Sequence, residues 1–159
     1  MTISSNLNAG SVRSGDDSPA FLASETALDE FFNTWEAARL PKSEWTHAAH
    51  VAVAACCAFE GDVDATFARM RAGIIRHNES VGTANTDTNG YHETLTRFWA
   101  GQICRLVRAD RYTSRLDAVR AAVQAFGNER DRFRRHYSFD VVGDRRARRE
   151  WVPPDLVSD

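Results

Sequence analysis

Three of the five histidines in this chain, with two glutamates near them, lie in two short polar segments and are well suited to metal or acid–base chemistry. The first contains Glu44, His47 and His50. The second, about forty residues later, contains His92 and Glu93. Neutral imidazole and carboxylate are ordinary ligands of zinc, iron, manganese and nickel, and they also act as general acids and bases. If the two segments meet in the fold, they predict either a metal centre or a metal-free acid–base site.

The first segment is predicted to be the start of a buried helix that Ser43 caps. His47 and His50 are three residues apart, a spacing that makes side chains neighbours on a helix, roughly 5–6 Å apart at Cβ. The two imidazoles can therefore share one ion or one water molecule, and Glu44 extends the row. Two structural interpretations stay open: core histidines bonded to carbonyls or hydroxyls, and a first-turn acid favoured by the helix dipole.

The second segment is predicted to open another helix at Tyr91. His92 falls on the same stripe as Trp99, so we expect its ring to face the interior. The positive end of the helix dipole disfavours imidazolium there, and a neutral ring is a ready metal ligand or general base. Glu93 has two interpretations: an ion pair with Arg97, four residues later, or a ligand or proton carrier beside His92.

A polar loop, residues 85–90, precedes this helix. Backbone N–H groups at a helix start attract anions, so the loop can hold a carboxylate or phosphate of a substrate; the alternative is a solvated turn. The candidates for substrate binding lie on this loop and on the predicted helices around it: Asn85, Thr86, Thr94, Thr96, Arg76, Trp45 and Trp99. The candidates for catalysis are Glu93, Glu44 and Tyr91.

Apolar spacing along the chain predicts an all-α fold: one domain over residues 23–159, built as a bundle of about five helices with an irregular C-terminal segment. Residues 1–22 have few large apolar side chains and are predicted to be a disordered leader. The helices are expected at about residues 24–40, 43–59 and 64–78, from residue 91, and at 114–126. The second helix is apolar on all sides after His50, which is typical of a central helix. His77 is expected at the surface.

The composition narrows the class of protein. With 20 basic and 22 acidic residues in 159, the net charge is −2, which argues against a nucleic-acid binder because such proteins usually carry a basic excess. No apolar run approaches the ~20 residues that span a bilayer, and residues 1–19 lack the apolar centre of a signal peptide. We therefore expect a cytoplasmic protein that acts on a small molecule, without a membrane or nucleic-acid partner. The sequence does not predict its oligomeric state.

The three cysteines, Cys56, Cys57 and Cys104, form no Cys-x-x-Cys motif. In a cytoplasmic protein they are predicted to be buried, reduced thiols. A cysteine nucleophile or a thiolate metal ligand is the alternative.

Three stretches of the sequence resemble a family of small bacterial helical proteins whose activity is uncharacterised. They are residues 45–50 (Trp-Thr-His-Ala-Ala-His), 90–96 (Gly-Tyr-His-Glu-Thr-Leu-Thr) and 151–156 (Trp-Val-Pro-Pro-Asp-Leu). The likeness spans about residues 25–156, and it brings no activity or cofactor with it. It implies one shared site made of His47, His50, His92 and Glu93 together with Tyr91 and Thr94.

The first functional hypothesis is a metal-dependent enzyme. His47, His50 and His92, with Glu93 or Glu44, would bind one divalent ion, either zinc, iron, manganese or nickel. The metal would act as a Lewis acid or lower the pKa of a bound water, and the remaining carboxylate would carry the proton. Hydrolysis or elimination on a small polar molecule fits this site best, and an oxygen-activating iron centre is less favoured.

Two further hypotheses assign these histidines roles that need no metal. In a metal-free enzyme, His50 or His92 would be a general base oriented by Glu44 or Glu93, and the 85–90 loop would bind an anion. In a non-catalytic binding or sensor module, the histidines would be structural, and the arginine-rich C-terminal region would dock a partner.

Overall fold

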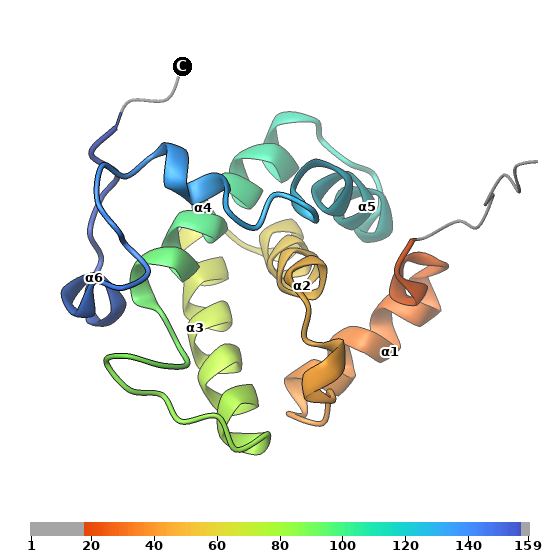
Figure 1. Cartoon of the computed structure of the whole chain (residues 1–159). Helices are drawn as coiled ribbons and strands as arrows, with labels where there is room; N and C mark the ends of the chain where they lie inside the picture. Colours follow the sequence, from red (N-terminus) through yellow and green to blue (C-terminus); the bar gives the residue numbers. More distant parts are fainter. Residues whose placement is uncertain (1–17, 157–159) are drawn as a thin grey trace, which may run out of the picture.

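The described part of the chain, residues 18–156 of a computed structural model, consists of helices joined by turns and loops, without a strand (Figure 1). The predicted all-α fold class is confirmed. The α-helices are α1 (Glu25–Glu36), α2 (His47–Glu60), α3 (Val63–Ser80), α4 (Glu93–Ala109), α5 (Arg115–Phe126) and the short α6 (Arg145–Arg149). Three 3-10 turns, η1 (Ala20–Leu22), η2 (Lys42–Glu44) and η3 (Arg132–Arg135), lie between or before them. No helix of the described residues is long and apolar enough to cross a membrane.

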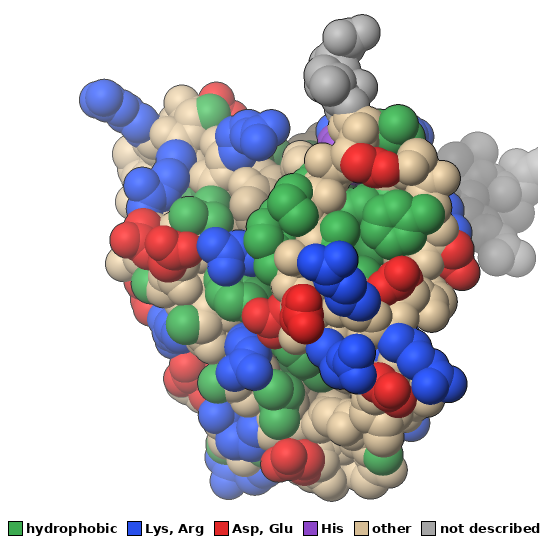
Figure 2. All heavy atoms as spheres, turned by 90° about the vertical axis from the view of Figure 1, so that its left-hand side faces the viewer, with side chains coloured by type: hydrophobic (Ala, Val, Ile, Leu, Met, Phe, Trp, Pro, Cys, Tyr) green, Lys and Arg blue, Asp and Glu red, His purple; other side chains and the backbone are tan. Residues whose placement is uncertain are grey.

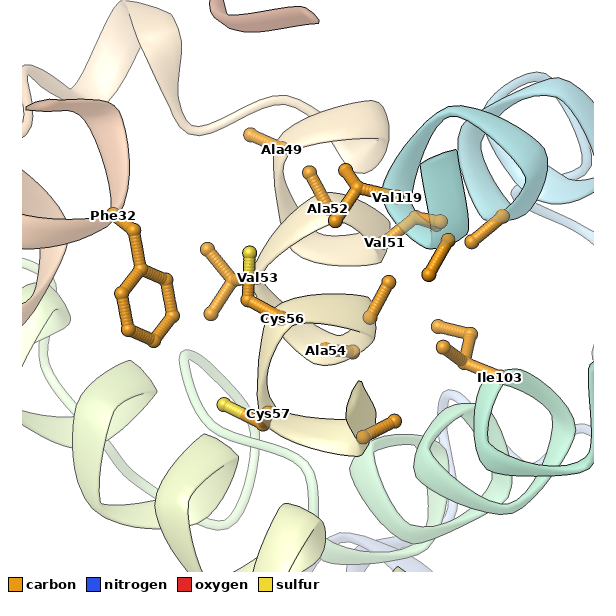
Figure 3. Packing of buried hydrophobic residues seen from close by; sticks show 14 of the residues in the cluster. Phe32, Ala49, Val51, Ala52, Val53, Ala54, Cys56, Cys57, Ile103 and Val119 are labelled. Carbon is orange, nitrogen blue, oxygen red and sulfur yellow. The ribbon is translucent and has the colours of Figure 1, made fainter. Parts of the chain in front are cut away.

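Helix α2 occupies the centre of the bundle, as its apolar sequence predicts. Every residue from 51 to 58 is buried, and the helix packs against α3, α4 and α5. Figure 3 shows its small side chains surrounded by Phe32 of α1, Ile103 of α4 and Val119 of α5. Because six of the fourteen residues of α2 are alanine, the neighbouring helices can approach closely and hold its first turn in a fixed position.

Side-chain caps fix where the helices begin. Ser24, Asp62 and Ser114 each accept a hydrogen bond from the backbone N–H three residues later, which is how short polar residues satisfy the free donors of a first turn. The prediction that Ser43 caps α2 is wrong. Thr46 is the cap, with its hydroxyl 3.2 Å from the N–H of Ala49. Helix α2 therefore begins at His47, and Glu44 lies outside it in η2.

The ordered domain begins before residue 23. The turn η1 packs on α1 and α5, with Leu22 buried and the ring of Phe21 stacked on that of Phe31 at 4.3 Å. The predicted disordered leader, residues 1–22, therefore includes five residues that have defined structure, and its remainder, residues 1–17, lies outside the described residues.

The segment after α5 folds back over α4 and forms a second apolar cluster there. Its buried members are Phe98 of α4 with Phe133, Tyr137, Val141 and Ala147. The predicted irregular C-terminal segment thus contains a short helix and a 3-10 turn, and it covers the start of α4. Figure 2, which views the molecule from the side of α6, shows basic and acidic side chains interspersed with apolar patches on this face.

The three cysteines are free and buried, as predicted. Burial raises the pKa of each thiol, that of Cys57 to about 12. All three therefore stay protonated at neutral pH, so these thiols are core side chains and poor nucleophiles.

Candidate functional site

The first turns of α2 and α4 flank a cavity of about 420 Å³, within the range of about 300–1,000 Å³ that is usual for small-molecule sites. Helix α3 contributes Met70 and Ile74 to its wall, and the segment after α5 contributes Arg130 and Phe133. Seven of the residues predicted for the site line this cavity: Trp45, His47, His50, Tyr91, His92, Thr96 and Trp99.

His47 lines the cavity with one ring nitrogen already in use. Its Nε2 donates to the carbonyl oxygen of Phe126, the last residue of α5, at 3.1 Å. The ring also meets the edge of Trp99, with centroids 4.9 Å apart. Burial lowers the pKa of His47, and the nearby Arg130 adds to this, while the bond to Phe126 opposes it. His47 is therefore a neutral imidazole with its hydrogen on Nε2, and Nδ1 is left as an acceptor.

His50 has the opposite tautomer. Its Nδ1 donates to the carbonyl of Thr46 at 2.8 Å, so the lone pair is on Nε2. The ring stacks on Trp45 at a centroid distance of 3.7 Å. Burial, together with the neighbouring His47, lowers the pKa of His50 to about 4. Neither Nε2 of His50 nor Nδ1 of His47 has a hydrogen bond to a described residue.

Trp45 connects this wall of the cavity to the core. Its ring lies between that of His50 and those of Trp35 and His77, at centroid distances of 5.8 and 5.1 Å from the latter two. The prediction that His77 is a surface residue is wrong, because its side chain is fully buried and Nε2 donates to the carbonyl of Leu40 at 3.0 Å. The packing of Trp45 on Trp35 and His77 therefore fixes the surface on which the His50 ring stacks.

His92 is the cap of α4, and both of its ring nitrogens are engaged. Nδ1 accepts from the N–H of Leu95 at 3.3 Å, and Nε2 donates to the carbonyl of Val141 at 2.9 Å. Burial lowers its pKa, so it is neutral but has no lone pair left for a metal. Helix α4 begins one residue after His92, and the prediction that Tyr91 opens it is wrong.

The predicted three-histidine metal site is therefore not assembled in residues 18–156. No group of three or more histidine, cysteine, aspartate or glutamate side chains in this range is arranged to hold a metal ion. His47 and His50 are the two histidines that keep an unused nitrogen on the cavity wall. A catalytic zinc site usually has three protein ligands, so this pair alone is a poor fit for a resident metal.

Tyr91 and Glu93 form a polar network at the start of α4. The phenol of Tyr91 donates to Oε2 of Glu93 at 2.9 Å, and Nε of Arg71 donates to the same oxygen at 3.2 Å. Burial and the carboxylate raise the pKa of Tyr91 well above its usual value. The predicted ion pair of Glu93 with Arg97 is wrong, since Arg97 lies 3.6 Å from Asp64 instead. Tyr91 lines the cavity. Glu93 does not line it and contacts the site through its hydrogen bond with the phenol of Tyr91.

Three of the predicted site residues stabilise loops around the cavity and do not line it. The amide oxygen of Asn85 accepts from the side chain of Asn78 at 2.8 Å and from the N–H of Tyr91 at 3.0 Å. The hydroxyl of Thr86 accepts from backbone N–H groups of its own turn. Thr94 is fully buried and bonds the C-terminal segment, at 2.7 Å to the carbonyl of Glu150.

Glu44 and Arg76 also lie outside the cavity wall, and both are exposed. Glu44 therefore does not form a row with His47 and His50, because the break between η2 and α2 interrupts the helical spacing on which that prediction depended. Neither side chain contributes to the site.

Sequence analysis did not single out Arg130, which is the one charged residue among those that line the cavity in the described structure. It is exposed, and no carboxylate of the described residues lies within ion-pair distance of it. By contrast, Arg132, Arg134 and Arg135 of the same charged run each have a carboxylate partner within 4.0 Å. Arg130 is thus a cation at the cavity that is available to an anionic ligand.

No protein-family model matches this chain, and no curated protein or solved structure is detectably similar to it. The resemblance of residues 45–50, 90–96 and 151–156 to small bacterial helical proteins therefore stays an expectation. What the cavity does has to be inferred from its own chemistry.

The two hydrogen bonds of the His92 ring are expected to stabilise the folded protein. In His92→Asn the new side chain can still cap α4 but cannot reach Val141, so we expect a loss of about 1–2 kcal/mol in the free energy of unfolding. Urea denaturation measures it, with Gln124→Ala, a change at an exposed position of α5, as the control. A variant of unchanged stability that instead lost a bound metal would return His92 to the role of ligand.

Proposed function

We propose that the protein is a small-molecule enzyme that uses His47 and His50 for metal-free acid–base catalysis in this cavity. The observation that supports it is the complementary tautomers: each ring gives its hydrogen to a backbone carbonyl and keeps a lone pair, at Nδ1 of His47 and at Nε2 of His50. Backbone carbonyls that fix the tautomer and orientation of an imidazole perform the task of the orienting group in known catalytic sites.

The two histidines are proposed to have different roles. A general base works best when its pKa is near the working pH, and a pKa of about 4 makes His50 a weak base that stays neutral as a hydrogen-bond acceptor. His47 is the proposed base. When its Nδ1 takes a proton, Nε2 keeps its bond to the carbonyl of Phe126, and that carbonyl then stabilises the positive charge.

This arrangement suits general-base hydrolysis. A water molecule held by both lone pairs donates one hydrogen to His50 and the other to His47. As His47 removes its proton, the water oxygen bonds to an acyl carbon of the substrate, the carbon–heteroatom bond of the substrate breaks, and His47 returns the proton to the departing atom. Proton transfer to a correctly positioned general base typically raises the rate of the chemical step by 10²–10⁴-fold.

The test uses variants that keep the structural bond of each ring. Glutamine at position 47 can place an N–H where Nε2 was, and asparagine at position 50 can place one where Nδ1 was, so His47→Gln and His50→Asn remove mainly the free lone pairs. We expect a panel of small esters, lactones, amides and ureides to reveal hydrolysis that survives exhaustive chelation and falls at least about 100-fold in His47→Gln. The matched control is His136→Gln, outside the cavity.

A metal-dependent enzyme remains the second candidate, because two unused imidazole nitrogens on one cavity wall are also ordinary metal ligands. Elemental analysis of the untagged protein separates the two. Near one equivalent of zinc, iron, manganese or nickel, lost in His47→Gln together with activity, supports the metal. Turnover by metal-free protein supports acid–base catalysis by His47. Ligand binding without turnover of any substrate class supports the non-catalytic binding module.

A further inference from the structure

The residues that line the cavity change in character along α2 and α4. Near the starts of the two helices the wall is mostly polar or aromatic, through Trp45, Thr46, His47, His50, Tyr91, His92, Thr96 and Trp99. Farther along both helices, and on α3, it is apolar throughout, with Val51, Ala54, Ala100, Ile103, Met70 and Ile74. We call the first set the mouth of the cavity and the second set its inner end.

Exposure and helix geometry both place the inner end deeper in the protein. Each of its six residues is at most 8% exposed, whereas the mouth residues are half-buried or exposed, with the exception of His92. Ala54 comes seven residues after His47 on α2, about 10 Å farther along the helix axis. Ile103 comes seven residues after Thr96 on α4. Figure 3 shows Ile103 directed from α4 toward Ala54 of α2, so the cavity extends from its mouth into the core between helices.

The mouth offers a ligand both acceptors and donors of hydrogen bonds. Nδ1 of His47 and Nε2 of His50 keep their lone pairs. The indole N–H groups of Trp45 and Trp99 have no hydrogen-bond partner within residues 18–156. An amide group can use both kinds of partner, and the carbonyl of an ester can use the donors. A hydrolysable amide or ester group therefore suits the mouth.

The inner end has a different chemistry, because none of its side chains carries a nitrogen or oxygen atom. A polar group placed there would be buried without a partner, which costs free energy. An apolar chain gains by leaving water, by about fourfold in affinity for each methylene group. Since the inner residues expose so little surface, the space among them is narrow and suits one unbranched chain.

We propose that the molecule bound here is an ester or amide of an unbranched, apolar carboxylic acid of medium chain length. Its acyl chain lies at the inner end, between α2, α3 and α4, and its ester or amide group lies at the mouth beside His47 and His50. This inference rests on the small-molecule site proposed above and names its substrate class. The acyl carbon at the head of the chain is the atom that a water molecule held by the two histidines attacks.

A series of N-methylalkanamides tests this class without requiring turnover. The series runs from N-methylacetamide to N-methyldodecanamide in steps of two methylene groups, so that the head group is constant and the chain alone varies. Titration is followed by tryptophan fluorescence, since Trp45 and Trp99 line the mouth. We expect affinity to rise about fourfold per methylene group up to a limiting length, and to stop rising before N-methyldodecanamide, because the inner end is closed.

Two variants at the inner end are expected to move this limit in opposite directions. Ala54→Leu adds bulk to the wall and should shorten the limiting chain by at least one member of the series. Met70→Ala removes bulk and should lengthen it by at least one member. The matched control is Ala68→Leu, the same change at an exposed position of α3 outside the cavity, and it should leave the limit unchanged.

The proposed class is overturned by affinity that does not depend on chain length, by affinity that rises evenly through N-methyldodecanamide, or by no binding of any probe. A limit that neither inner variant moves, or that Ala68→Leu moves equally, also overturns it. If one inner variant does not fold, the shift or its absence in the other decides.

The outcome is separable from that of the proposed catalysis. Binding with a limiting chain length, in a protein that hydrolyses no ester or amide, contradicts the enzyme and leaves the ligand class standing. Chelation-resistant hydrolysis of acetyl compounds, with no increase in kcat/KM for longer acyl chains, does the reverse.

Discussion

Replacing Gly73 with alanine is expected to destabilise the protein by about 3 kcal/mol or more. Gly73 lies within α3, and the six-membered ring of Trp35 from α1 occupies the space into which a Cβ would project. Trp35 is 1% exposed and packs between Phe32 and Trp45, with centroids 5.8 Å from each. The ring has no room to move, so α1 or α3 would have to shift. Urea denaturation measures the loss as a lower midpoint at unchanged slope.

The chain provides a matched control in Gly101, within α4. A Cβ there would meet nothing within 4 Å, so Gly101→Ala is expected to be neutral or to stabilise the protein by up to about 1 kcal/mol through helix propensity. A second variant tests the cause. In Gly73→Ala with Trp35→Leu, the smaller side chain leaves room for the new methyl group, and the two changes together should cost less than the sum of their separate effects. Equal stabilities for Gly73→Ala and Gly101→Ala would contradict the packing of Trp35 on α3.

The same contact supports the candidate site. Trp35 packs on Trp45, and Trp45 stacks on His50 at the cavity wall. A shift of α1 away from α3 would therefore move the surface that holds the His50 ring. We infer that Gly73 positions the site indirectly, through three aromatic rings in sequence.

The helical fold could be predicted because its signals are local. The apolar stretch after His50 predicts a central helix, and α2 is buried on all sides. The polar residues that precede the helices predict their starts to within a few positions, since a short side chain that accepts from the first turn is a local device. Ser43 and Thr46 are both suitable caps for α2 by residue type, and the structure has Thr46 in that role.

The site could be predicted in part. The spacing of His47 and His50 identifies one wall of the cavity, because neighbours on a helix stay neighbours in the fold. His92 was a more difficult case. Its Nε2 bonds to the carbonyl of Val141, 49 residues later, and no local pattern shows such a partner. A histidine before a helix looks the same in sequence whether its second nitrogen is used or free.

Arg130 could not be distinguished from its neighbours by sequence. Four arginines lie between residues 130 and 135, and their composition is that of a solvated charged turn. Three of them pair with Glu129 or Asp131. Only the three-dimensional path of the chain after α5 places the remaining one at the cavity.

Acidification from about pH 7 to about pH 5 is expected to lower the free energy of unfolding by about 2 kcal/mol through His50 alone. The pKa of His50 is about 4 in the folded protein, against a usual value of 6.5. Below pH 6.5 the unfolded chain therefore binds a proton at this residue that the folded protein does not bind. Stability is complete above the unfolded pKa and is lost as the pH falls toward the folded pKa. Burial lowers the pKa of His47, His92 and His136 as well, which adds to the loss in the same direction.

Urea denaturation of the parent and of His50→Asn at a series of pH values measures this contribution. The variant keeps a donor for the Thr46 carbonyl but has no titrating group, so its stability should fall less steeply across this range. Gln124→Ala is the control, because Gln124 is exposed and carries no titrating group. Equal slopes for the parent and His50→Asn would mean that the His50 ring takes up a proton as readily in the folded chain as in the unfolded one. A ring that did so would be cationic in mildly acidic solution, and the acceptor character of this part of the cavity would not persist there.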